Sequence, residues 1–129
     1  DNIENKLGKI KFLIFYLLIG ILSAFFHILL VSPGEKSFPV IGASGAISGL
    51  LGGYLVLFPR NRIRAFFLFF FQPIFFYLPA FLYIGIWFLY QLEYIGTLTS
   101  IAYFAHISGF LSGAILVLLL RKRVKKRNK

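Results

Sequence analysis

The chain has 129 residues, of which 59% are hydrophobic and 14% charged, with 17 Phe and a formal net charge of +10. A soluble domain of this length cannot bury that much apolar surface, because soluble domains are about 45–50% apolar. The composition therefore excludes a soluble enzyme, a disordered tail and, since Cys is absent, a disulfide scaffold, and it predicts an integral membrane protein.

Long uncharged segments alternate with clusters of Lys and Arg along the chain. A helix needs about 20 apolar residues to cross a bilayer core of about 30 Å, so we expect an all-α transmembrane bundle of about four spans. The expected spans are Phe12–Val31, Val40–Phe58, Tyr77–Leu92 and Ala105–Leu120. Four crossings place every Lys and Arg except Lys36 on one side, which the positive-inside rule makes cytoplasmic.

The first span follows a basic segment and ends at the turn sequence Ser32-Pro33-Gly34. Its apolar core is too long for a signal peptide, and no small-x-small cleavage site follows it. His27 lies near its outer end, where an ionisable side chain is often functional. No acidic residue or motif surrounds His27, so we expect it to bond a neighbouring carbonyl or interfacial water.

The second span begins with Gly42-Ala43-Ser44-Gly45, and Gly45, Gly49 and Gly53 recur every four residues. These glycines lie along one helix face, and small residues at this spacing let membrane helices pack closely. Ser44 lies in the first helical turn, where backbone N–H groups lack intrahelical partners and can hold an oxyanion. Taken alone, the motif indicates helix packing.

The segment Ala65–Phe76 is rich in Phe and is broken by Gln72-Pro73. It is too short to cross the membrane and return as two helices, so we expect an interfacial or shallow re-entrant segment on the cytoplasmic side. A single kinked helix from Ala65 is the alternative. In the first case the third span starts near Pro79, a residue that suits a first helical turn.

The fourth span carries Ala105-His106-Ile107-Ser108-Gly109, and Gly109 and Gly113 repeat the four-residue spacing. Counted back from the basic residue after each span at about 1.5 Å per residue, Ser44 and His106 both lie about 22–24 Å from the cytoplasmic boundary. If the two glycine faces meet, the Ser44 hydroxyl and the His106 imidazole come within hydrogen-bond reach.

Such a pair has a chemical use, because serine becomes a good nucleophile only when a base such as neutral imidazole removes its proton. All four acidic residues lie outside the expected spans, so a Ser44–His106 dyad is favoured over a triad with a carboxylate. Two His residues on separate helices, without an acid in the membrane, do not predict a metal site.

The two motifs in this order resemble the rhomboid intramembrane serine proteases, together with Phe58-Pro59-Arg60 and Leu78-Pro79-Ala80. The resemblance covers essentially the whole chain and implies the third to sixth helices of a six-helix core. It implies that Ser44 is the nucleophile and His106 the base, and that no cofactor is used. It also implies a substrate gate on the helix that carries Trp87, for which a lipid-facing position is the alternative.

The chain departs from the family pattern in three places. The second core helix, which supplies a His and an Asn near the oxyanion, would precede Asp1. Because the chain contains no Met, we expect it to be an internal or C-terminal piece of a longer protein, inactive alone. Ser48 stands where some members carry an aromatic residue that packs on the catalytic His, and Thr99-Ser100 stands where a Gly pair is frequent.

We therefore expect a serine endopeptidase that cleaves transmembrane segments, with Gly42, Ala43 and Gly45 shaping the backbone around the oxyanion. The expected partners are transmembrane protein substrates and membrane lipid, without nucleic acid. The basic loops and the tail Arg121–Lys129 would be cytoplasmic and the active site near the outer face of a bacterial-type plasma membrane. The alternatives are a catalytically inactive relative that binds membrane helices and, from another class, a transporter fragment.

Overall fold

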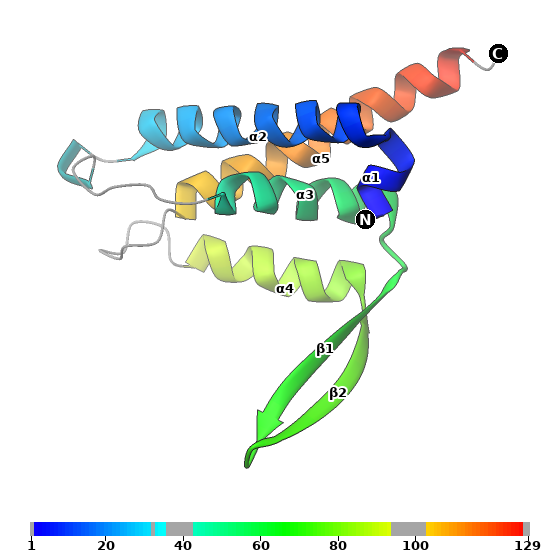
Figure 1. The fold of residues 1–129 in the computed structure, drawn as a ribbon. Helices are drawn as coiled ribbons and strands as arrows, with labels where there is room; N and C mark the ends of the chain where they lie inside the picture. Colours follow the sequence, from blue (N-terminus) through cyan, green and yellow to red (C-terminus); the bar gives the residue numbers. More distant parts are fainter. Residues whose placement is uncertain (1, 32, 36–42, 94–102, 128–129) are drawn as a thin grey trace.

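The computed structural model describes residues 2–31, 33–35, 43–93 and 103–127 and is mostly helical (Figure 1). Its helices are α1 (Asn2–Leu7), α2 (Lys9–Leu30), the 3₁₀ turn η1 (Pro33–Glu35), α3 (Ser44–Leu57), α4 (Ala80–Glu93) and α5 (Tyr103–Arg127). Two strands, β1 (Arg62–Phe69) and β2 (Gln72–Pro79), come between α3 and α4 in the chain. Each of the four expected spans therefore contains one helix, with shifted ends.

The long helices form a bundle in which α3 and α5 share the largest interface (Figure 1). Helix α2 packs against both of them, and α4 packs against the same pair through smaller interfaces. Figure 1 shows that α3 and α5 run in the same direction. The first residues of these two helices therefore lie at the same end of the bundle.

Glycine residues bring the backbones of α3 and α5 together. The backbone of Gly113 lies against the carbonyl of Gly49, and that of Gly109 lies against the carbonyl of Gly45. Gly52 contacts the carbonyl of Phe110 in the same way. A side chain at any of these glycines would collide with the backbone of the partner helix, so the close approach depends on the missing Cβ.

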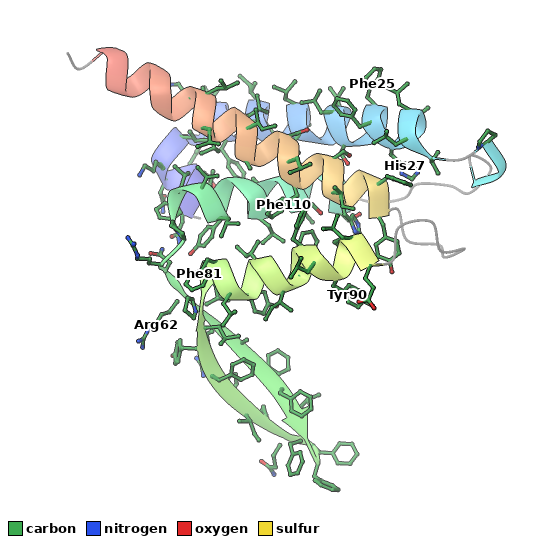
Figure 2. The ribbon with its side chains drawn as sticks, turned by 180° about the vertical axis from the view of Figure 1, so that it is seen from behind. Phe25, His27, Arg62, Phe81, Tyr90 and Phe110 are labelled. Carbon is green, nitrogen blue, oxygen red and sulfur yellow. The ribbon has the colours of Figure 1, made fainter. Side chains whose placement is uncertain are left out.

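Two clusters of buried apolar side chains hold the remaining helices. The first joins α1, α2 and α5 through Ile3, Phe15, Ile19 and Val117. The second joins α4 to α5 through Ala80, Ile84 and Phe110. Many large apolar side chains outside these clusters are exposed. One of them is Phe25, which projects from α2 away from the bundle (Figure 2), as expected of a helix that faces lipid.

Within the part of the chain that the structure describes, two helical segments are long and apolar enough to cross a membrane, namely Lys9–Leu30 and Tyr103–Leu120. Helices α3 and α4 are also apolar, but each has 14 residues and is about 21 Å long. The start of the second expected span, at Val40, lies outside the described residues. A four-span topology stays a prediction.

The segment between α3 and α4 forms an antiparallel hairpin, so the prediction of an all-α fold and the alternative of a kinked helix from Ala65 are wrong here. Strand β1 pairs with β2 from Arg62 opposite Pro79 to Phe69 opposite Gln72. Phe70 and Phe71 make the turn with positive φ values of 45° and 63°, the backbone of a two-residue hairpin turn. Aromatic residues favour strands, and proline is tolerated because both strands are edges.

Candidate active site

Ser44 is the first residue of α3 and is exposed. Ala43 precedes it as the N-cap, and Ile47 donates the first intrahelical hydrogen bond to the Ala43 carbonyl at 2.9 Å. The N–H groups of the residues between them therefore have no carbonyl one turn earlier in the same helix. Ser44 therefore lies at the positive end of α3, in the turn that carries these donors. Gly42 lies outside the described residues.

Ser48 lies one helical turn after Ser44 and is 2% exposed. Its hydroxyl donates a hydrogen bond of 2.7 Å to the Ser44 carbonyl. The residue that departs from the family pattern thus satisfies its own polar group within α3. The aromatic rings beside the His106 imidazole come instead from Trp87 of α4 and Tyr103 of α5.

Buried serines join α2 to α5 next to the first turn of α3. The Ser23 hydroxyl donates a hydrogen bond of 2.7 Å to the Ala105 carbonyl, and its side chain contacts Gly45. The Ser108 hydroxyl donates to the Phe104 carbonyl at 2.7 Å and lies 3.3 Å from the Ser23 carbonyl. Sequence reasoning missed Ser23; the available signal was a small polar residue one turn before His27 in an otherwise apolar helix.

His106 lies in the first turns of α5 and is partly buried. Its Nδ1 is 2.7 Å from Oε1 of Gln91, a residue of α4 that is 4% exposed. The Trp87 ring centroid lies 6.2 Å from that of the imidazole, and the Tyr103 ring lies edge-on at 6.3 Å. These three side chains enclose His106, and the sequence analysis had assigned Gln91 no role.

Trp87 also lies 6.0 Å from the ring of Phe110, which is stacked on Phe88 at 4.5 Å. Figure 2 shows Phe110 between α5 and α4. Trp87 therefore lies on the face of α4 that packs against α5 and is not a purely lipid-facing side chain. Its role as a gate stays a prediction.

His27 lies in the last turn of α2 and is 8% exposed. Figure 2 shows it at the end of the bundle where α5 begins. The structure thus places both His residues of the chain at one end of the bundle, together with Ser44.

Ser44 and His106 are brought to adjacent positions on α3 and α5, because Gly45 packs against Ala105 and Gly109. Among the described hydrogen bonds, none joins the two side chains directly; the bond of the imidazole goes to Gln91. This end of the bundle carries an exposed hydroxyl at the N-terminus of α3 and, on the neighbouring helix α5, a histidine bonded to an amide. Such a set of groups suits nucleophilic acyl transfer.

Comparison with known proteins adds one finding. A family model described as "Rhomboid domain" matches residues 1–123. No curated protein and no solved structure matches the chain.

Proposed function

The chain belongs to the rhomboid family, and on this premise we propose that it supplies the catalytic pair of an intramembrane serine endopeptidase. Ser44 is the nucleophile and His106 the general base. The match over residues 1–123 supports the family, and the positions of the two residues on α3 and α5 support their roles. The substrates are proteins whose transmembrane segments are cleaved within the bilayer.

One observation carries the proposal. The glycine contacts between α3 and α5 place Gly45 against Ala105, which are the neighbours in sequence of Ser44 and His106. Two parallel helices with this contact hold the hydroxyl and the imidazole at one end of the bundle. That the exposed Ser44 and the partly buried His106 both adjoin this contact in the sequence supports a shared site over helix packing alone.

In the proposed reaction the Ser44 oxygen attacks the scissile carbonyl carbon while His106 accepts the hydroxyl proton. The N–H groups at the start of α3 hold the oxyanion, and the helix dipole adds to this stabilisation. His106 then donates the proton to the departing amine, which leaves an acyl-enzyme. A water molecule, activated by His106, hydrolyses the ester and restores both side chains.

The substrate helix has to unwind locally before it can react. A regular helix keeps its carbonyls hydrogen-bonded to its own N–H groups, and in lipid each of these bonds is costly to break. Ser44 and His106 lie at the end of the bundle where α2 ends and α3 and α5 begin. The cleaved part of the substrate is therefore a segment near the end of its transmembrane helix.

The proposal is tested by labelling the full-length protein in membranes with a fluorophosphonate, which reacts with activated serines. We expect labelling that is lost in Ser44→Ala and falls by at least about 10²-fold in His106→Ala, since general-base catalysis contributes about 10²–10⁴-fold. Ser112→Ala, which changes another partly buried serine of α5, is the matched control and keeps the label. A folded protein without any label would favour an inactive relative that binds membrane helices.

A further inference from the structure

We propose that Gln91 is a positioning residue for His106, so that the site is a Ser44–His106–Gln91 triad with a neutral amide as its third member. This inference rests on the proposed function, because it gives Gln91 a role in the reaction of that same site. The observation that carries it is the contact of 2.7 Å between His106 Nδ1 and Gln91 Oε1.

The orientation of the Gln91 amide, with Oε1 toward the ring, sets the position of the proton. An amide oxygen can only accept a hydrogen bond, so Nδ1 of His106 has to carry the hydrogen. In a neutral imidazole the lone pair then lies on Nε2. Nε2 is the nitrogen on the far side of the ring from α4, and it is the one left to accept the proton of the Ser44 hydroxyl.

The surroundings of the pair hold this geometry. Gln91 is 4% exposed, and water competes little for a hydrogen bond at such a position. Trp87 lies one turn before Gln91 on α4 and packs against both His106 and Phe110, which are themselves one turn apart on α5. The ring is thus fixed by a hydrogen bond at one edge and by an aromatic side chain near its face.

Packing alone does not explain why an amide side chain occupies position 91. Gln91 is the only amide in α4, and a polar side chain inside a membrane helix is costly unless it has a partner. Glu93, the acidic residue of the same helix, is exposed and points elsewhere, because two residues rotate a helix by about 200°. The amide therefore takes the place that a carboxylate holds in a Ser–His–Asp triad.

The tautomer can be measured directly by nitrogen-15 NMR of histidine in the full chain. The chain has two His residues, so a His27→Asn variant assigns the two sets of signals. We expect neutral His106 to carry its hydrogen on Nδ1, and to redistribute toward Nε2–H in Gln91→Met, which keeps the length of the side chain but lacks the acceptor. Hydrogen on Nε2 in the native protein, or an unchanged ratio in Gln91→Met, would overturn the inference.

Turnover of a transmembrane substrate gives the second readout. We expect Gln91→Met to lower kcat about tenfold, the factor of a neutral hydrogen bond, with KM nearly unchanged. Gln91→Glu, which restores an acceptor, should recover most of the rate. Gln72→Met is the matched control, because it makes the same change at the exposed start of β2 and should leave kcat unchanged.

The outcomes separate this inference from the proposed function. The tautomer is measured in the native chain and in Ser44→Ala, so it does not depend on turnover. An Nδ1–H imidazole in a protein whose activity survives Ser44→Ala would sink the proposed function while the contact to Gln91 stands. Full activity of Gln91→Met in a protein that Ser44→Ala inactivates would sink the positioning role alone.

Discussion

Single hydroxyl groups tie the helices together around the candidate site. The buried Ser23 hydroxyl reaches from α2 to the Ala105 carbonyl of α5, directly before the histidine. We expect Ser23→Ala to destabilise the protein by about 1 kcal/mol, because an interhelical hydrogen bond of this kind contributes that amount in membranes. Unfolding in mixed detergent measures it.

Ser112→Ala is the comparison for this prediction, since Ser112 is a partly buried serine on α5 and the described hydrogen bonds between α2 and α5 are made by Ser23 and Ser108. Its effect should stay within about 0.5 kcal/mol. Equal effects of the two substitutions would show that the Ser23 bond contributes nothing to the contact.

The residues of the site differ in how far sequence could predict them. Ser44 and His106 stand in short motifs with glycine, and the spacing of those glycines predicts the close helix pair on which both residues lie. Gln91 stands alone among apolar residues, and its hydrogen-bond partner, His106, lies on another helix. A lone polar residue does not specify its partner, so only the three-dimensional arrangement reveals this contact.

At the level of helices, the pair α3–α5 depends on glycine at the points of backbone contact. Gly113→Ala places a methyl group against the Gly49 carbonyl, and we expect it to destabilise the bundle by about 1–3 kcal/mol. Gly85 of α4 has open space where a Cβ would lie. Gly85→Ala should therefore be neutral or stabilising by up to about 1 kcal/mol.

Both glycine variants are compared by the detergent or denaturant concentration at half unfolding. The prediction concerns the difference between them, because helix propensity changes in the same direction at both positions. A Gly113→Ala protein as stable as Gly85→Ala would mean that the two backbones do not touch in the membrane.

The hairpin shows where sequence patterns stop being informative. A run of consecutive Phe residues has neither the period of two of an amphipathic strand nor the period of a helix, so the fold of 62–79 could not be predicted from hydropathy. The decisive features are local: aromatic strand propensity, a proline after Gln72 and a two-residue turn. Such features depend on pairing with the other strand, which a single segment does not reveal.

We propose that the hairpin lies in the cytoplasmic interface of the bilayer. Phe71 at its tip is 98% exposed, whereas Arg62 and Arg64 lie near its base, with the Arg64 guanidinium 4.1 Å from the Phe75 ring. Apolar tips enter the acyl region and arginines bind phosphates. Figure 2 shows Arg62 where the hairpin meets the bundle.

A tryptophan at the tip tests this position. In a Trp87→Phe background, which removes the only Trp of the chain, we expect the fluorescence of Phe71→Trp to be quenched by lipids brominated on their acyl chains. Water-soluble quenchers should have little effect on it. The reverse pattern would place the hairpin tip in water and exclude an interfacial anchor.

For the whole molecule, the distribution of charge predicts the orientation in the membrane. Arg60 follows α3, and with the other basic residues except Lys36 it belongs to the side that the positive-inside rule makes cytoplasmic. The chain contains no Cys, so single-cysteine variants report sidedness without background. We expect Arg60→Cys to react with an impermeant maleimide only after the membrane is opened, and Lys36→Cys to react in intact cells.

Reaction of both cysteines from the same side would rule out an odd number of crossings between positions 36 and 60, and with it the predicted topology. The family assignment would survive that result, since it rests on the match over residues 1–123. Resemblance in two short motifs predicted that family, and the family model confirms it.

The unequal way in which the helices are joined has a mechanical consequence. Helices α3 and α5 contact each other backbone to backbone. Helix α4, in contrast, packs against them through aromatic and apolar side chains and the Gln91 amide. The first turn of α4 is fixed by backbone hydrogen bonds of Ala80 and Phe81 to the carbonyls of Asn61 and Pro59. The rest of α4 is held by side chains, so its other end can move outward while α3 and α5 stay together. Such a movement would break the hydrogen bond between Gln91 and His106. The base would then lack its positioning contact until α4 returns to the bundle.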